Sequence, residues 1–542
     1  MARITAQAVT ATAVVDTPRP GLVGWFASAD HKRVGVLTGA TALVLFLLSG
    51  TLGVLMRLEL ALPGLQLFSH DAYNQLFTAH GAGMFYLVFT PLALGLAVYL
   101  VPLQVGAAEI FAPRLAQLGL WLLLSGAVTT YAGYFTQEGG AKTGWTAFVP
   151  LTDVQNSPGT GTDLWAVGTI VVNVGMILQA FCILATLLRL RAPGMTMLRL
   201  PVFSWSALVS CLMVLTSFPA LLVALTLLEF DRRGWWGVFE GGGGPIAYQH
   251  LFWFYGHPVV YVVFFPFVGA VGEVAAVFSQ RRFFGYSALV LSLLLFSALS
   301  MSVWAHHMFT TGQVQNEYFS LTSTALLIPA GVEYFDLIGT MIGGAIVLRT
   351  PMLFAIGFLL LFLFGGLSGI IVASPVLDYH VHDSFFVVAH FHYTLFGGSV
   401  FGLFAALYYW WPKFTGTMLR EGLGRVHFAL WFVGMNMTFF PMFVLGYEGM
   451  PRRLADYSSS DGWTGLNLVA TAGALVLFVG ALVFVWNVVS SLSRRVPAPA
   501  DPWLGHTLEW ATSSPPPRHN FDELPPVLSF APLLDLREQG AR

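Results

Sequence analysis

The chain has 542 residues, of which 56% are hydrophobic, 15% are aromatic and only 10% are charged. Soluble globular proteins carry roughly a quarter of charged residues, so a water-soluble chain of this length has too little charge to cover its surface. Lipid must therefore solvate much of it. The net charge of −2 gives no support for nucleic-acid binding. The two cysteines lie far apart inside apolar runs, which excludes a disulfide framework and a CxxCH heme-attachment motif.

The chain begins with a polar segment, residues 1–33, which is rich in Ala, Thr and Val up to Arg19. It lacks the charged start, apolar centre and cleavage pattern of a signal peptide. We expect this segment to be cytoplasmic and membrane insertion to begin with the first spanning helix.

Residues 34–491 contain the apolar runs, each long enough for the roughly 20 residues that cross a bilayer. In lipid only helices or closed barrels satisfy the backbone, and these runs are too long and too continuously apolar for barrel strands. The sequence therefore predicts an all-α membrane protein, a bundle of about twelve transmembrane helices. The predicted spans are 34–56, 79–104, 115–137, 164–190, 204–228, 248–279, 284–308, 319–347, 352–374, 384–411, 426–447 and 465–491. Residues 492–542 are Pro-rich and polar, which predicts an extended cytoplasmic tail.

The distribution of positive charge gives the orientation. With the N-terminus inside, 19 of the 25 lysines and arginines fall on the cytoplasmic side, as the positive-inside rule requires. The others are Arg57, Lys142, Arg232, Arg233, Arg452 and Arg453. Both termini inside fits an even number of spans.

Ionisable residues inside spans are costly and usually functional, and here they are histidines. They lie at the start of the second predicted span, in the sixth, at the end of the seventh and in the tenth. In that order they are His80, His257, His306, His307, His390 and His392. One buried histidine is most often a hydrogen-bonding partner between helices, but six favour metal binding, because imidazole is a common neutral ligand for iron and copper.

The spacings of these histidines indicate how they are used. His390 and His392 project about 200° apart on a helix, so they can serve two sites on opposite sides of it. His257 and Tyr261 are four residues apart and share a face. The adjacent His306 and His307 can reach one ion only near a distorted helix end, and the residues after Met308 suggest that the helix ends there.

Three sequence blocks, by their order and their places within the spans, carry a resemblance to a known family. They are His257-Pro-x-x-Tyr261, His306-His307 and His390-Phe391-His392. On these blocks the chain resembles subunit I, the catalytic subunit, of the heme-copper oxygen reductases, the superfamily that includes the cytochrome c oxidases. The resemblance extends from Trp25-Phe26 to Asn520-Phe521.

The resemblance implies a role for each histidine. His80 and His392 would be the axial ligands of a low-spin heme iron, and His390 would bind a high-spin heme iron. His257, His306 and His307 would bind the copper that faces it. Tyr261 would be joined covalently to His257.

The resemblance also implies partners for the hemes and a further metal. Arg57 resembles the arginine near the formyl group of the low-spin heme. Arg452 and Arg453 resemble the pair that holds the heme propionates, to which guanidinium groups are suited. His382 and Asp383 resemble a magnesium site whose remaining ligand comes from another subunit.

The sequence departs from the family where protons travel. Val259 stands where many members have a glutamate, and a valine cannot relay a proton. Tyr255 resembles the tyrosine that some relatives use instead. Glu109 replaces the usual aspartate at the mouth of one proton channel. Glu333 replaces the usual lysine of the second channel, and we expect it to serve a proton path to Tyr261.

The implied function is a respiratory terminal oxidase that reduces dioxygen to water, coupled to proton uptake or pumping. The implied cofactors are two hemes, with a-type favoured and b- or o-type as alternatives, one copper ion and magnesium. The implied partners are a subunit II that carries a dinuclear copper site, a subunit III or other small membrane subunits, and cytochrome c as electron donor. The expected location is the bacterial plasma membrane.

Three other functions fit part of the sequence. A quinol oxidase has the same histidines. A nitric oxide reductase of the same superfamily typically lacks the His-linked tyrosine, so Tyr261 argues against it. A twelve-span secondary transporter fits the hydropathy but does not require paired histidines.

Overall fold

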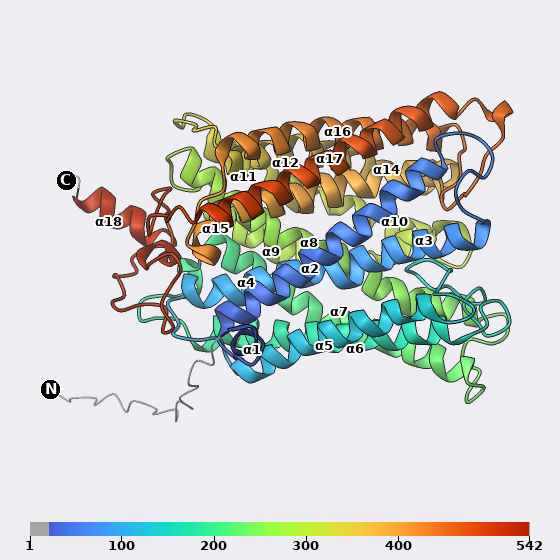
Figure 1. Ribbon diagram of the computed structural model, residues 1–542, viewed down its shortest axis with the longest axis horizontal. Coiled ribbons are helices and arrows are strands. Elements are labelled where there is room, and N and C mark those ends of the chain that lie inside the picture. The colour runs from blue at the N-terminus through green and yellow to red at the C-terminus, as the bar shows by residue number, and fades with distance from the viewer. Residues whose placement is uncertain (1–20, 541–542) are drawn as a thin grey trace.

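The computed structural model describes residues 21–540, and Figure 1 shows long helices that run side by side along one axis. Twelve of them are long and apolar enough to cross a membrane. Within residues 21–540 there is no strand beyond two isolated bridges. The predicted fold class is therefore confirmed. The division at residues 33 and 491 stays a prediction, and residues 1–20 of the first segment lie outside the described residues.

Seven of the spans are each one uninterrupted helix. They are α2 (His31–Glu59), α6 (Thr160–Arg189), α7 (Val202–Arg232), α8 (Gly244–Phe278), α12 (Thr350–Ala373), α16 (Glu421–Tyr447) and α17 (Thr464–Arg494).

The other five spans are each built from several helical segments. The second joins α3 (His70–Ala82), η1 (Gly83–Phe89) and α4 (Thr90–Gln104), and the third joins α5 (Pro113–Ala132) to η2 (Gly133–Phe135). The seventh joins α9 (Tyr286–Ser300) to η4 (Trp304–Thr311), and the eighth joins α10 (Asn316–Ala325) to α11 (Leu327–Met341). The tenth joins α14 (Phe385–Thr394), η5 (Leu395–Val400) and α15 (Phe401–Thr415).

The second span begins at His70 rather than at residue 79. Its first turns are polar, so hydropathy does not register them, and the hydroxyl of Ser69 caps the helix by accepting from the N–H of Ala72 at 3.2 Å. The eighth span ends at Met341, earlier than the predicted 347. It stops before Gly343, whose φ of +72° is left-handed.

Close contact between neighbouring helices depends on small residues. A side chain at Gly126 of α5 would lie 2.7 Å from the carbonyl oxygen of Gly168 on α6. Since lipid gives little hydrophobic drive for helices to associate, such close backbone packing stabilises the bundle.

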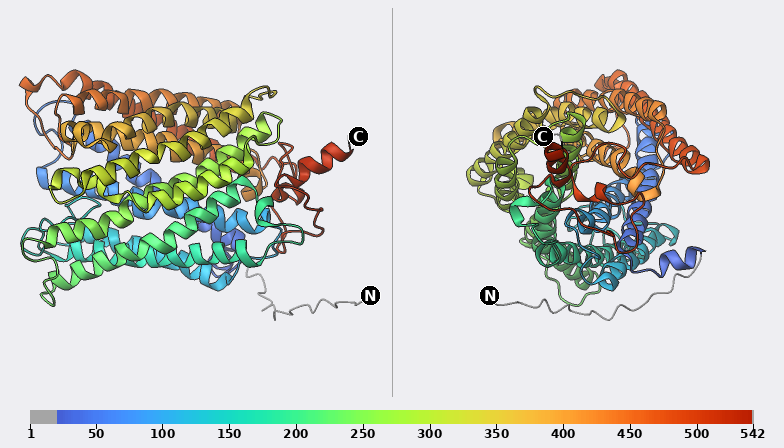
Figure 2. Two further views of the ribbon diagram at one scale, coloured as in Figure 1. Left: turned by 180° about the vertical axis from the view of Figure 1, so that it is seen from behind. Right: turned by 90° about the vertical axis from the view of Figure 1, so that its left-hand side faces the viewer.

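Six short helices of the described chain lie outside the spans. They are α1 (Gly21–Phe26), η3 (Met197–Arg199), α13 (Pro375–Val381), η6 (Ser459–Asp461), η7 (Leu508–Ala511) and α18 (Pro532–Gly540). In Figures 1 and 2, α1 and α18 lie at the same end of the bundle, which is what an even number of spans produces.

The tail crosses that end of the bundle and is fixed to it by buried polar contacts. Lys413 of α15 donates from Nζ to the carbonyl oxygen of Thr512 at 2.7 Å. Glu509 accepts from Trp410 at 2.9 Å and from Gln104 at 3.2 Å. The tail consists of turns and irregular segments with the short helix η7, and its last helix, α18, was not expected from the polar composition.

Candidate metal centre

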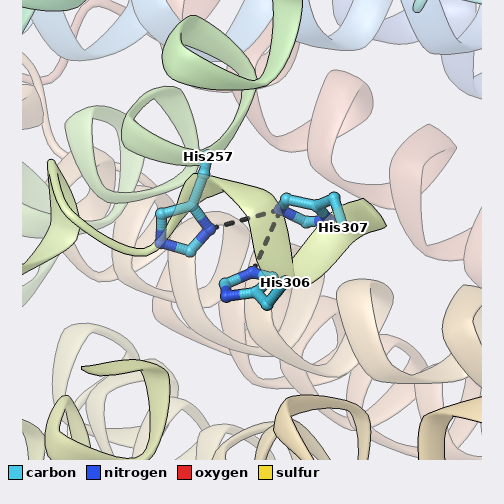
Figure 3. A group of neighbouring side chains, drawn as sticks. All are labelled: His257, His306 and His307. Atoms are coloured by element: carbon cyan, nitrogen blue, oxygen red, sulfur yellow. Dashed lines mark hydrogen bonds between the residues drawn. The ribbon is translucent and has the colours of Figure 1, made fainter. Parts of the chain in front are cut away.

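Three imidazoles converge between α8 and η4. His257 Nδ1 and His306 Nε2 each lie 3.2 Å from His307 Nε2, and Figure 3 shows the three rings turned toward one another. Ligand atoms of all three residues lie within 4.8 Å of one another. Three nitrogens pointed at one spot are the donor set of a soft or borderline metal such as copper.

The local backbone explains how two adjacent histidines reach this spot. They lie on η4, a 3₁₀ segment in which Met308 has non-helical angles, with φ −127° and ψ 16°. The segment begins after α9 has ended at Ser300. The distorted helix end that the sequence required is therefore present. The Trp253 ring stacks on His307 with centroids 3.9 Å apart and fixes the plane of that imidazole.

Hydrogen bonds set the tautomer of His306. The Ser323 hydroxyl donates its one proton to the carbonyl oxygen of Phe319, so it accepts from His306 Nδ1 at 2.7 Å. A neutral imidazole carries one N–H, and the lone pair of His306 is therefore on Nε2, directed at the centre.

Tyr261 lies next to His257, one helical turn further along α8. The ring centroids are 4.7 Å apart. His257 turns Nδ1 toward the other histidines, and no residue of the described chain bonds to its Nε2. The shared face predicted from the i, i+4 spacing is therefore present.

His390 and His392 leave α14 on different sides. His390 Nδ1 donates to the carbonyl oxygen of Gly365 on α12 at 3.1 Å and contacts Ser368 Oγ at 3.0 Å. His392 Nδ1 donates to the carbonyl oxygen of Val388 at 2.9 Å. Because a carbonyl oxygen only accepts, both imidazoles keep a lone pair on Nε2.

His80 of α3 faces His392 across a gap. Its Nδ1 donates to the carbonyl oxygen of Ser49 at 2.7 Å, which again leaves the lone pair on Nε2. The two ring centroids are 6.4 Å apart and the planes differ by 19°. When both Nε2 atoms point into the gap, this centroid separation equals two metal–nitrogen bonds of about 2 Å each plus the radii of the two rings.

A large cavity extends from this gap. It has a volume of about 580 Å³ and is lined mainly by apolar and aromatic side chains of α2, α3, α14, α16 and α17, with His80, His392, Arg57, Arg452 and Arg453 among its lining residues. A flat, largely apolar cofactor with charged substituents fits such a lining.

The Arg57 side chain is only partly satisfied inside this cavity. Its Nη2 donates to Asn467 Oδ1 at 2.7 Å. Its Nε and Nη1 are buried, and within residues 21–540 they have no partner. A buried guanidinium group needs an acceptor, and a polar substituent of a cofactor in the cavity would supply one.

Arg452 and Arg453 also line the cavity. Arg452 forms an ion pair with Asp383, and Arg453 lies over the Phe77 ring at 5.7 Å. Burial alone would raise the pKa of Asp383, but Arg452, with His382 and Arg453, holds that pKa below its usual range. His382 turns to a different partner, Asp378 Oδ2, at 2.8 Å. The structure thus gives the proposed magnesium ligands separate partners within the chain.

Comparisons with known proteins agree with this geometry. The sequence pattern of the family described as cytochrome c and quinol oxidase polypeptide I matches residues 33–476. The chain belongs to this family.

Relatives of this oxidase subunit match over almost the whole chain. It is 50% identical to a probable cytochrome c oxidase subunit 1-beta of Nocardia farcinica, over 94% of this chain and 87% of the relative. It is 46% identical to cytochrome c oxidase subunit 1 of Corynebacterium efficiens, over 96% of this chain and 90% of the relative. A heme-copper terminal oxidase dimer solved by cryo-electron microscopy shares the fold, with a TM-score of 0.74 at 19% identity, and the match covers 85% of this chain and 84% of that one.

The three proton-path candidates of the oxidase subunit lie in different places. Glu109 is in the loop before α5, where Oε1 accepts from the N–H of His31 at 3.1 Å and of Ile110 at 3.0 Å. Burial raises its pKa to about 7. Tyr255 is fully buried on α8, and its hydroxyl has no partner among the described residues.

Glu333 is buried on α11 against α9. Ser292 lies 3.4 Å from its Oε1, and Oε2 has no partner within the described chain. The carboxyl group is close enough to Tyr261 to act on it electrostatically.

Sequence reasoning missed the groups that orient the imidazoles. Ser49, Ser323, Gly365 and Ser368 come from other helices and carry no local signal. It also missed Asp336, a second buried acid three residues after Glu333. That spacing, which places both acids on one helix face, was a usable signal.

Two π-helical segments were also missed. The segment η1 begins three residues after His80, and η5 begins three residues after His392. Such segments are frequent at functional sites.

Proposed function

We propose that this chain is the catalytic subunit of a respiratory cytochrome c oxidase, which reduces dioxygen to water. The observation that carries the proposal is the convergence of three imidazole nitrogens beside Tyr261, together with two further histidines on opposite sides of α14. Sequence identities of 50% and 46% to two relatives named as cytochrome c oxidase subunit 1 support it.

His257, His306 and His307 are the proposed copper ligands, and His390 is the proposed ligand of the high-spin heme iron. His80 and His392 are the proposed ligands of the low-spin heme iron. When bound, the two hemes and the copper supply the electron transfer and the metals at which oxygen is reduced. The lone pairs on Nε2 of His80, His306, His390 and His392 and the near-parallel rings of His80 and His392 support this assignment.

The arginines are proposed to neutralise and orient the hemes. Arg57 supplies unpaired N–H groups to the substituent of the low-spin heme, and Arg452 and Arg453 supply positive charge to the propionates. We favour a-type hemes. Magnesium between His382 and Asp383 is proposed to require the rotation of His382 away from Asp378 and a further ligand from a partner subunit.

Tyr261 is proposed to hold a proton and an electron at its phenol oxygen, beside the site of oxygen reduction. Its place next to the unpartnered Nε2 of His257 supports a covalent bond between the two residues, in which an N–C bond replaces the Nε2–H bond of His257 and one ring C–H bond of Tyr261, and dioxygen accepts the two electrons and two protons that are released. Glu333 is proposed to return the proton to Tyr261, with Ser292 and Asp336 on the same side. A group that relays protons through dry helices needs a titratable atom that is free to bond water, and Glu333 Oε2 is such an atom.

A second proposed path begins at Glu109 and ends at Tyr255. The raised pKa of Glu109 places its proton exchange near neutral pH, which suits uptake from the cytoplasm. We propose that both termini are cytoplasmic, that the membrane is the bacterial plasma membrane, and that a subunit II with a dinuclear copper site and a subunit III complete the enzyme.

Oxygen uptake by the purified complex tests the function. With reduced cytochrome c we expect cyanide-sensitive oxygen consumption, and with quinol alone we expect none. Uptake with quinol but not with cytochrome c would make the enzyme a quinol oxidase. Anaerobic consumption of nitric oxide without oxygen uptake would make it a nitric oxide reductase.

A further inference from the structure

A second cavity opens at the end of the bundle that carries the tail. It has a volume of about 780 Å³ and lies between α1, the first turns of α2, the last residues of α15 and α17, and tail residues 515–518. It is separate from the heme cavity, with which it shares no lining residue.

The lining of this cavity has a cationic floor. Among the described residues, Lys32, Arg33 and Arg518 line it together with one carboxylate, Asp30. Lys32 Nζ is 3.1 Å from Asp30 Oδ1 and also donates to Asn520 Oδ1 at 2.8 Å, so these charges offset each other. Arg33 has no ion-pair partner within residues 21–540, so its positive charge remains for an anion.

The guanidinium group of Arg33 is fixed in place by two contacts. Its Nη1 donates to the carbonyl oxygen of Gly24 at 3.0 Å, and its guanidinium lies over the Trp25 ring at 5.5 Å. These contacts fix the plane of the group, and its other N–H groups have no partner in the part of the chain that the structure describes. A fixed guanidinium with free N–H groups suits the two oxygens of a phosphate.

Other lining residues of the cavity are apolar and lie at the ends of two helices that are long and apolar enough to span a membrane. Val36 belongs to the second turn of α2, and Leu492 lies near the last residue of α17. Trp25 is 40% exposed and Leu492 is 42% exposed, and tryptophan favours the membrane interface.

We propose that this cavity binds the phosphate group of an anionic phospholipid, with Arg33 as its anchor and with the acyl chains along α2 and α17. A basic pocket between spanning helices on the cytoplasmic side recognises such headgroups. A soluble phosphate ester offers the same anion but has no chains to cover Val36 and Leu492.

The position of the site gives the bound lipid a structural role. Lys32 joins the floor to Asn520 of the tail, and Asn520 donates to the carbonyl oxygen of Ala107 at 2.8 Å. The next residue after Asp30, His31, donates to Glu109. The headgroup therefore lies beside the contacts that hold the N-terminal end of α2, the tail and the Glu109 loop together.

Native mass spectrometry of the purified complex tests the proposal. The complex is exchanged into phosphatidylglycerol, which is anionic, or phosphatidylcholine, which is not. The variants are Arg33→Gln and, as a matched control, Arg349→Gln, an exposed arginine at the same end of the bundle and outside the cavity. We expect the occupancy of one phosphatidylglycerol to fall about fivefold in Arg33→Gln and to stay unchanged in Arg349→Gln.

Leu492→Asp provides a second variant, because it places a negative charge in the cavity at an exposed position and keeps Arg33. We expect it to lose the same phosphatidylglycerol. Equal occupancy in Arg33→Gln, Leu492→Asp and the control would overturn the proposal. Displacement of the lipid by millimolar glycerol phosphate, or equal retention of phosphatidylcholine, would also overturn it. None of these results depends on oxygen reduction.

Discussion

The proposed metal centre and the proposed proton paths differ in how their polar atoms are satisfied. His80, His390 and His392 each donate Nδ1–H to a backbone carbonyl oxygen, and His306 donates to Ser323. By contrast, Glu333 Oε2 and the Tyr255 hydroxyl are buried without a partner among the described residues.

This difference matches what each region has to do. A metal ligand needs one fixed lone pair, so the bonds behind it lock its tautomer and its direction. A proton carrier needs an open bonding position for water. A path of water accepts any titratable group, so Glu109 and Glu333 can both serve one, whereas a coordination sphere needs its particular ligands. Val259 is not titratable, and Tyr255 is the residue proposed to carry the proton in that part of α8.

The largest expected effect is the loss of a ligand. We expect His306→Ala to remove the copper and to abolish oxygen uptake, because two imidazoles leave the site open on one side. Metal analysis and an oxygen electrode measure the two effects. His519→Ala, which changes an exposed histidine of the tail, is the control and should behave as the wild type. Full copper content in His306→Ala would contradict the assignment.

A smaller but clear loss of turnover is expected from a change in the proposed proton path. Glu333→Gln keeps the shape of the side chain and removes its proton, so we expect turnover to fall about tenfold or more. Glu333→Asp should retain part of the activity. Glu317→Gln changes an exposed acid in the same span and should have no effect. Wild-type oxygen consumption in Glu333→Gln would show that no essential proton passes through this residue.

Glu109 should show its role through its titration. Its pKa is raised to about 7 by burial, so the carboxyl group stays protonated at pH 6 and ionises as the pH rises through 7. Infrared difference spectra of the wild type against Glu109→Gln should show a carboxylic acid band that disappears with a midpoint near pH 7. We expect a modest loss of turnover, because Glu109 lies at the mouth of its path. Full ionisation at pH 5 would refute this interpretation.

The smallest effect is expected from a residue that orients a proposed metal ligand without binding the metal itself. Ser323→Ala removes the acceptor of His306 Nδ1–H, and losses of this kind typically weaken metal binding about tenfold. A chelator titration measures the copper affinity. Turnover of the copper-loaded enzyme should stay near that of the wild type. Ser320→Ala, which removes a hydroxyl that bonds to Ala373 on α12 instead, is the matched control. Equal copper affinities would mean that Ser323 does not orient His306.

The local parts of the structure were predictable from the sequence. Hydropathy gave twelve spans, because each span is continuous in sequence and needs no partner to be recognised. The i, i+2 and i, i+4 spacings placed His390 opposite His392 and Tyr261 beside His257. The adjacent pair His306 and His307 required a distorted helix end, and η4 supplies it.

Contacts between distant segments were not predictable. Ser49 and His80 are 31 residues apart, and Asn520 and His31 are 489 residues apart. No periodicity connects such positions. Hydropathy also missed the first turns of α3, because they are polar and precede the apolar run. It missed α18 as well, because this helix is polar and is held in place by an ion pair between Arg282 and Asp535 at 2.7 Å.

The central claim is that one helix, α14, holds two different hemes through two histidines. Optical and pyridine hemochrome analysis of His392→Leu and His390→Leu tests it most directly. The wild type should contain two hemes per chain. The His392 variant should lose only the low-spin heme, and the His390 variant should lose only the high-spin heme. Loss of the same heme in both variants, or a wild-type complex without heme, would contradict the account.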